Sequence, residues 1–250
     1  MSKSSSKRQQ TQRDDVFSRL PYAYHEAGHA VVGHVIGRLI ALVSIKQATS
    51  YRGCCRFDLY AESTHHHDQW QKGRHHPELL TILSAGTVAV SLLCEQRGWD
   101  YEVVRTSDLQ DGAEIEQLSR EMFEDDAECT VALDACWKQA SDLLITHWNA
   151  VKTLAGELLA LQWVTGAEAY SIIREALGEV QGDWRWNVLQ ADPINQRRTA
   201  FAAERKRLVA DFLKGAITEQ ELDDGMARIQ EERLNILQST PAWHFFGSLF

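Results

Sequence analysis

Two histidines and a glutamate near the start of the chain have the types and spacing of a metal-dependent hydrolytic site. The segment reads Tyr-His-Glu-Ala-Gly-His-Ala-Val-Val over residues 24–32, within an apolar, helix-forming run from about residue 22 to about residue 42. His25 and His29 are four residues apart, so a helix projects both imidazoles from one face, one turn apart. At this spacing they can bind one zinc ion, each at about 2.0–2.1 Å.

Glu26 follows the first histidine directly and is too close in sequence to share its geometry as a ligand. It can instead reach a water on the metal and accept its proton, as the general base of a zinc hydrolase does. We therefore predict a catalytic glutamate at position 26. Gly28 supports the motif, because a helical glycine costs about 0.5–1 kcal/mol relative to alanine and indicates that another segment packs very close.

Such a site needs a third protein ligand, and the acidic residues after position 105 are the candidates. Residues 106–111 read Thr-Ser-Asp-Leu-Gln-Asp, and a capping box within them predicts the start of a helix. Asp108 then lies in the first turn beside the apolar stripe of that helix and is the expected third zinc ligand. Asp111 and Glu114 remain rivals, because they follow one and two turns later on an adjoining face.

The composition restricts the class of protein. The chain has 250 residues, 44% of them hydrophobic, and a net charge of −9, which predicts a globular protein and argues against a nucleic-acid binder. Residues 79–94 are uncharged but shorter than a membrane span, so we expect a buried core helix and no transmembrane segment. The five cysteines form no CxxC pair, which is typical of a reducing compartment. We expect a cytoplasmic protein, while the basic, serine-rich start leaves organelle targeting open.

The periodicity predicts a mainly α fold with a small sheet. Short strands are expected over residues 42–45 and 54–60, and helices over 78–96, over 126–162 as one helix or a pair, and from the capping box at 165–168 to 177. We divide the chain into a disordered tail (1–15), a core domain (16–178), a linker (179–198), a helical hairpin (199–238) and an aromatic tail (239–250). We interpret the hairpin either as a surface for a second copy or a partner, or as a satellite packed on the core domain.

A histidine-rich stretch has no assigned role. His65, His66, His67, His75 and His76 lie in a polar interval between the predicted strands and the first core helix. No fixed spacing or helix orders them as ligands, so we interpret the stretch as a surface loop and predict no metal site there.

The segments together resemble the peptidase domain of the FtsH family, the membrane-anchored AAA+ zinc proteases. The resemblance covers roughly residues 20–177. It includes His-Glu-Ala-Gly-His-Ala-Val-Val-Gly at 25–33, Val-Ser-Ile at 43–45, Leu-Ser-Ala-Gly at 83–86 and Gly-Ala-Glu-Ala at 166–169. Ser-Asp-Leu-Gln at 107–110 is similar to the family's "(S/N)D(L/I)" segment, whose aspartate is its third zinc ligand. The resemblance implies a zincin-like fold, with Asp108 as a ligand beside His25 and His29.

The chain departs from the family pattern in three places. No GxxxxGK[ST] phosphate loop occurs in the sequence, and no transmembrane helix precedes the metal motif. The family's charged "GGRAAEE"-like helix reads Ala-Gly-Thr-Val-Ala-Val-Ser over 85–91, without its charges. These departures predict a stand-alone relative that works without ATP.

The predicted function is a zinc endopeptidase that cleaves unfolded or flexible polypeptides. Two alternatives remain open. One is a proteolytically silent zinc protein that binds or regulates a partner, although such a protein has no chemical need of Glu26. The other is a peptidase subunit that works with a separate ATPase.

Overall fold

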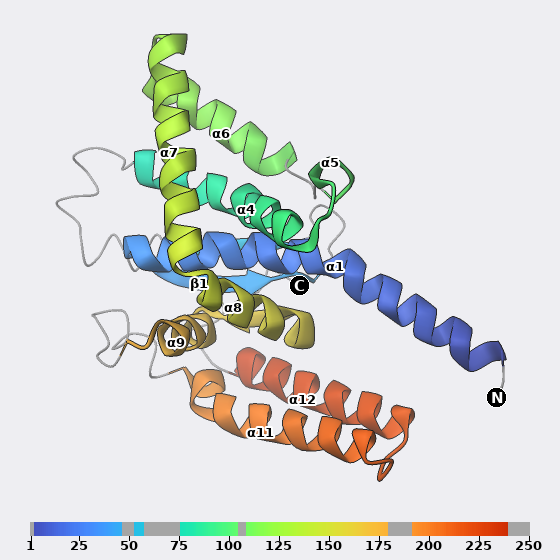
Figure 1. Ribbon diagram of the computed structural model, residues 1–250. Helices are drawn as coiled ribbons and strands as arrows, with labels where there is room; N and C mark the ends of the chain where they lie inside the picture. The colour runs from blue at the N-terminus through green and yellow to red at the C-terminus, as the bar shows by residue number, and fades with distance from the viewer. Residues whose placement is uncertain (1–2, 47–52, 58–75, 105–108, 180–191, 240–250) are drawn as a thin grey trace. The chain divides into compact units, whose positions relative to one another are not determined.

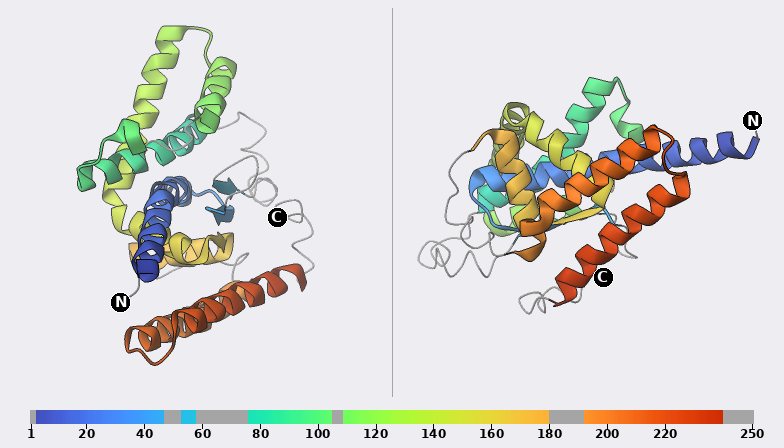
Figure 2. Two further views of the ribbon diagram at one scale, coloured as in Figure 1. Left: turned by 90° about the vertical axis from the view of Figure 1, so that its right-hand side faces the viewer. Right: turned by 90° about the horizontal axis from the view of Figure 1, so that it is seen from below.

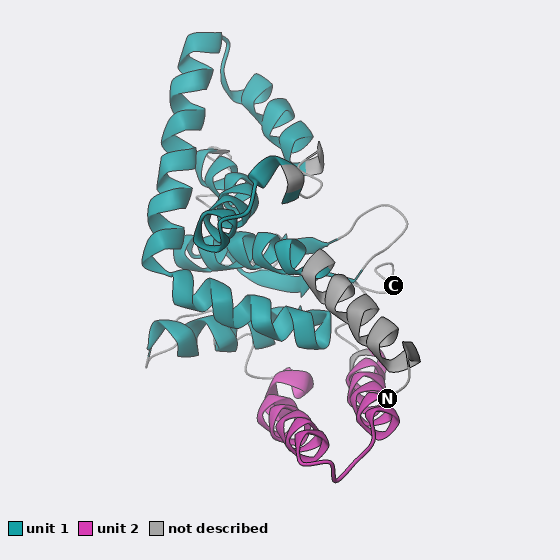
Figure 3. Ribbon diagram, turned by 45° about the vertical axis from the view of Figure 1, so that its right-hand side comes forward, with its two compact units in different colours: residues 1–181 teal, residues 182–250 magenta. Residues whose placement is uncertain are grey.

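The computed structural model describes residues 3–46, 53–57, 76–104, 109–179 and 192–239 (Figure 1). The chain divides into two compact units, residues 1–181 and residues 182–250 (Figure 3). This division falls three residues beyond the end predicted for the core domain. Each unit is described by itself.

The metal-motif helix, α1, extends from Lys3 to Ile36 and ends at Gly37, which has a φ of +100°. The sequence favours a helix end near residues 37–41, close to the observed one, but it does not predict this start. Residues 3–15, predicted to be a disordered tail, form the first turns of α1. Lys, Arg and Gln are good helix formers, and extending an existing helix is much less costly than nucleating one.

The sheet has three antiparallel strands, β1 (Ile40–Ser44), β2 (Cys54–Phe57) and β3 (Trp163–Thr165), in the order β2-β1-β3. The sequence predicted the first two strands but not β3, because its last residue, Thr165, was interpreted only as a helix cap. Thr165 is both a strand residue, which pairs with Leu42, and the cap of the next helix through a capping box with Glu168. The expected residues 58–60 of the second strand lie outside the described residues.

The core of the first unit forms around α1, which packs between α4 (His76–Arg97) on one side and α8 (Trp148–Leu161) on the other (Figure 1). The contact with α4 is close at Gly28. A Cβ there would lie 2.6 Å from the carbonyl oxygen of Ala85 and 2.7 Å from the Cβ of Ala89. The prediction that glycine at position 28 admits a closely packed segment is therefore confirmed, and that segment is α4.

Helix α4 is long and apolar enough to cross a membrane by length and composition. It is also largely buried against α1 and α7 (Asp126–Thr146), as expected of a core helix. It ends at Gly98, which has a left-handed φ of +64°.

The remaining helices of this unit are α5 (Tyr101–Val104), α6 (Leu109–Met122) and α9 (Gly166–Leu177). The predicted segment 126–162 is a helix pair, α7 and α8, which is divided at His147. Figure 2 shows α6 and α7 extending beyond α4, joined at their far ends, and both helices pack on α4. The predicted cap of α6 lies in residues 105–108, outside the described residues.

The second unit contains two packed helices, α11 (Pro193–Leu213) and α12 (Glu219–Ser239), in the region predicted to form a hairpin. Leu208 lies against Gly225, where a Cβ would be 2.7 Å from the leucine side chain. Residues 193–198, predicted to belong to the linker, are the first turns of α11, because Asp192 caps the helix and Pro193 is its first residue.

Candidate metal centre

His25 and His29 point the same way from α1. Their Nε2 atoms are 3.0 Å apart and their rings are nearly perpendicular, with centroids 4.6 Å apart. Both residues are buried, at 7% and 6% exposure. One helical turn therefore brings the two imidazole nitrogens to a common point inside the protein, as the spacing predicts.

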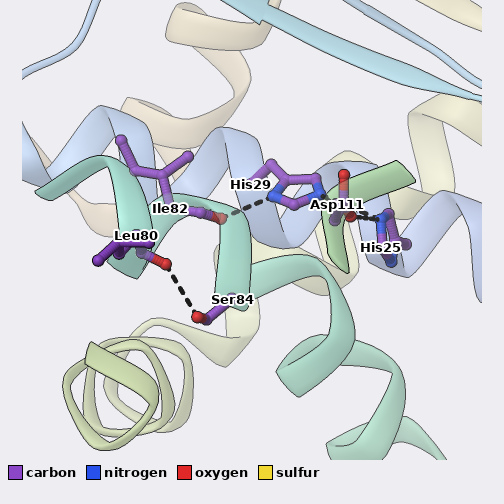
Figure 4. A network of polar contacts seen from close by, with 6 residues as sticks. All are labelled: His25, His29, Leu80, Ile82, Ser84 and Asp111. Carbon is purple, nitrogen blue, oxygen red and sulfur yellow. Dashed lines mark hydrogen bonds and ion pairs between the residues drawn. The ribbon is translucent and has the colours of Figure 1, made fainter. Parts of the chain in front are cut away.

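The backbone of α4 orients one of the two imidazoles (Figure 4). His29 donates a hydrogen bond from Nδ1 to the main-chain carbonyl of Ile82 over 2.7 Å. A carbonyl can only accept, so the proton must be on Nδ1 and the Nε2 lone pair of the neutral ring faces His25. Histidines that ligate metals are commonly oriented through their other nitrogen in this way. Nδ1 of His25 is buried and has no such partner among the described residues.

A glycine makes room for both rings. A Cβ on Gly86 of α4 would lie 2.4 Å from Nε2 of His29 and 2.7 Å from Nε2 of His25. The small residues Ala85 and Gly86 let α1 approach α4 closely, and Gly86 lies against the ligand atoms themselves.

Asp111 completes the group from the first turn of α6. Its Oδ2 lies 2.7 Å from Nε2 of His25 and 3.2 Å from Nε2 of His29. Helix α6 thus brings an oxygen donor to two nitrogens that lie more than 80 residues earlier in the chain. The side chain of Asp111 is about one-fifth exposed, so the site opens toward solvent on this side.

The three donor atoms fit a zinc ion. Tetrahedral ligands at about 2.0–2.1 Å from a metal are about 3.3 Å apart. The separations of 2.7, 3.0 and 3.2 Å are close to that value, so small side-chain adjustments would place all three ligands around one ion. Two imidazoles and one carboxylate are also ligand types that zinc prefers, and three protein ligands leave a fourth position for water.

The electrostatics of the group favour a cation among the three donors. Burial disfavours a charge on His29, but the hydrogen bond to Asp111 and the nearby carboxylates outweigh it and raise the pKa of His29 to about 9. Burial likewise opposes ionisation of Asp111, yet its hydrogen bonds to His25 and His29 hold its pKa well below the usual 3.8. A divalent ion among the three donors would be stabilised by the same nearby carboxylates.

Glu26 lies beside this group as a buried carboxylate, 5% exposed. Burial raises its pKa, and the charge of Asp111 adds to the increase, while His25 and His29 oppose it. A glutamate with a raised pKa is a better proton acceptor at neutral pH than an exposed one. Its environment is therefore suited to a general base.

The other acidic candidates have different positions. Asp108, the expected third ligand, lies outside the described residues. Asp111 is the acidic candidate that the structure brings to both imidazoles, whereas Glu114 is exposed and outside the group of converging donors. Of the histidine-rich stretch, residues 65–67 and 75 lie outside the described residues, and His76 begins α4.

Two cysteines, Cys54 and Cys55, are the first residues of β2 and lie near Glu26. Burial raises the pKa of the Cys54 thiol to about 11, and the carboxylate of Glu26 adds to the increase. Burial also raises the pKa of the Cys55 thiol well above its usual value, and the nearby charges of Glu26 and Asp111 add to the increase. Both thiols therefore stay protonated at neutral pH, and neither belongs to the group of three donors.

A scan against protein-family models gave no match, and a search of curated proteins found no similar sequence.

Proposed function

We propose that this chain is a zinc metalloendopeptidase that acts, without ATP, on unfolded or flexible polypeptides. The observation that carries the proposal is the convergence of His25, His29 and Asp111 beside the buried carboxylate of Glu26. Hydrolytic zinc sites use three protein ligands and a nearby carboxylate base. The resemblance of residues 20–177 to the FtsH peptidase domain, and hence to a zincin-like fold, supports the same function.

When bound, zinc would supply a Lewis acid that lowers the pKa of water and polarises the carbonyl of a peptide bond. The chain's own residues have separate tasks. His25, His29 and Asp111 provide the ligand set, and the Ile82 carbonyl keeps His29 in the tautomer with a free Nε2 lone pair. Glu26 accepts the proton of the attacking water and then donates it to the departing amine.

The sheet offers a place for the substrate. Among the described strands β2 lies at an edge, and Gly53, the residue before it, touches the carboxylate of Glu26. An extended peptide can pair with such an edge as an additional strand, which would bring its carbonyl groups to the metal centre. Only an unfolded or locally flexible chain can adopt this conformation, so we propose substrates of that kind.

Cleavage of casein by the full chain tests the proposal, together with measurement of bound metal. We expect about one zinc per chain, and cleavage that a chelator abolishes and added zinc restores. Glu26→Gln should keep the zinc and lose at least about 10²-fold in activity, because the amide cannot accept a proton. Glu128→Gln, the same change on the exposed first turn of α7, serves as the control and should retain full activity.

Other results would replace this function with a different one. Bound zinc without cleavage of casein would indicate a zinc protein that binds a partner instead. Cleavage that requires nucleotide and a co-purifying ATPase would indicate a peptidase subunit of a larger machine. Full activity in Glu26→Gln would remove the proposed mechanism.

A further inference from the structure

The backbone at the start of β2 lies directly against the carboxyl group of Glu26. A Cβ on Gly53 would be 2.4 Å from Oε1 of Glu26 and 3.0 Å from its Cγ and Cδ. Real Cβ atoms essentially never approach another heavy atom to 2.4 Å, so any side chain at position 53 requires Glu26 to move. The contact joins two segments that the sequence analysis treated separately, the metal-motif helix and the second strand.

We propose that Gly53 is a positioning residue for Glu26, which holds the carboxylate of the general base at its place beside the metal centre. The proposal rests on the proposed hydrolytic function, since it gives Gly53 a task in water activation. In this role the main chain of Gly53 forms one wall of the space that the carboxylate occupies, and the absence of a side chain sets the position of that wall.

Steric room, and not backbone conformation, is the reason for glycine at this position. Gly37, Gly98, Gly178 and Gly215 have left-handed φ angles, but Gly53 does not, so alanine could adopt its backbone conformation without strain. What alanine lacks is space. The three nearest atoms around the added Cβ all belong to Glu26, and none belongs to another part of the chain.

Strand β2 cannot easily move away from the carboxylate of Glu26. Cys54, the next residue, pairs with Ser44, and Cys55 pairs with Val43, so β2 is fixed to the central strand of the sheet. Glu26, in contrast, has a flexible side chain whose far end is the contacting group. An alanine at position 53 should therefore displace the carboxylate by about 1 Å and leave the sheet in place, and a displacement of this size can cost about 10²-fold in rate.

Gly86 has the corresponding relationship to the ligands. The three atoms nearest to an alanine Cβ there would all belong to His25 and His29, including Nε2 of each ring. Substitutions at the two glycines therefore test the two parts of the site independently: Gly53 the general base, and Gly86 the histidine ligands. Gly53→Ala should impair proton transfer while zinc stays bound, and Gly86→Ala should impair zinc binding itself.

The activity measurement uses the zinc-loaded full chain with a fluorogenic peptide. Gly53→Ala should lower kcat by about 10²-fold with KM and zinc content unchanged. Gly156→Ala is the matched control, because the described residues leave open space at that Cβ position, and it should retain kcat. Unchanged kcat in Gly53→Ala, or loss of its zinc, would overturn the proposal.

A second measurement does not depend on activity. In the metal-free chain Gly53→Ala should lower Tm by about 2–4 °C, the shift expected of modest side-chain strain in a chain of this size. In the Glu26→Ala background the same substitution should leave Tm unchanged, because the contacting carboxylate is gone. Equal shifts in both backgrounds would show that Gly53 supports the strand and not Glu26.

The two measurements separate the two proposals. If the native chain cleaves no peptide while the Tm cycle shows coupling, the proposed function fails and the restraint of Glu26 by Gly53 stands. If the chain is an active peptidase and the cycle shows no coupling, the function stands and the role of Gly53 fails.

Discussion

Asp111 lies 2.7 Å from His25, although the two residues are 86 positions apart in the chain. The contact joins the first turn of α6 to the middle of α1, and α6 otherwise packs mainly on α4. An ion held by these residues would therefore be a structural link as well as a reaction centre.

Asp111→Asn should weaken zinc binding more than about 100-fold, because loss of a ligand should exceed the 10–100-fold effect of losing a partner that only orients one. Competition with a chromophoric chelator measures the affinity. Asp108→Asn is the matched comparison, since it makes the same change three residues earlier in the sequence. If Asp108→Asn is the damaging change and Asp111→Asn is silent, the third ligand is the one expected from the sequence resemblance.

Removal of zinc should destabilise the first unit. A ligand that binds only the folded state, present at about 1,000 times its Kd, adds about 4 kcal/mol to the free energy of unfolding. In a chain of this size that corresponds to a rise in Tm of about 2–4 °C per kcal/mol. Calorimetry with and without chelator measures the difference, and the shift should disappear in His29→Ala. An equal Tm in both conditions would show that the ion does not link α6 to the core.

The stability of the metal-free chain should depend on pH through His29 and Asp111. The pKa of His29 is raised to about 9, so its stabilising contribution is complete below the usual 6.5 and is lost as the pH rises toward 9. The pKa of Asp111 is lowered, so its contribution is complete above the usual 3.8 and is lost as the pH falls below that value. Tm measured in chelator should therefore be highest, as far as this pair decides it, between about pH 4 and about pH 6.5.

The control for this pH dependence is Asp111→Asn, which removes the charge that His29 responds to. Its metal-free Tm should decline less between neutral and alkaline pH than that of the native chain. Parallel curves for the two proteins would assign the dependence to other groups.

Gly28→Ala should destabilise the chain despite the better helix propensity of alanine. The propensity gain is about 0.5–1 kcal/mol, whereas the new Cβ would meet the main-chain oxygen of Ala85 at 2.6 Å, and overpacking of this kind costs about 1–3 kcal/mol. Urea unfolding should show a net loss of about 1–2 kcal/mol. Gly156→Ala, with open space on α8 among the described residues, should instead stabilise by about 0.5–1 kcal/mol.

The sequence predicted those parts of the site that depend on local spacing. His25 and His29 converge because four residues make about one turn of any helix. Gly28 indicated a close neighbour because glycine lowers the stability of a helix unless it admits another segment. The choice between Asp108 and Asp111 was not accessible in the same way. The docking of α6 on α4 brings Asp111 to the imidazoles, and local spacing does not reveal that tertiary contact, while Asp108 lies outside the described residues.

The fold shows the same division between local and tertiary information. The ends of α1 and α4 could be predicted approximately because glycine commonly closes a helix in a left-handed conformation, which Gly37 and Gly98 adopt. Strand β3 could not be predicted in this way, because a segment of three residues is too short to show an alternation of polar and apolar side chains. These residues form a strand only by pairing with β1. The helical start of α1 was not predicted, because a polar composition shows that a segment has little apolar surface to bury. It does not show how easily the segment extends a helix that is already formed.

The hydrogen bond from His29 ends on a main-chain oxygen, that of Ile82, and this has a consequence for how the site can change. Every amino acid at position 82 carries the same carbonyl, so no point substitution there deletes the acceptor. Loss of this acceptor would require the backbone of α4 to shift, and the close fit of that helix to α1 at Gly28 opposes such a shift. A single substitution at position 111 can remove the carboxylate of Asp111, whereas no substitution at position 82 can remove the acceptor that orients His29.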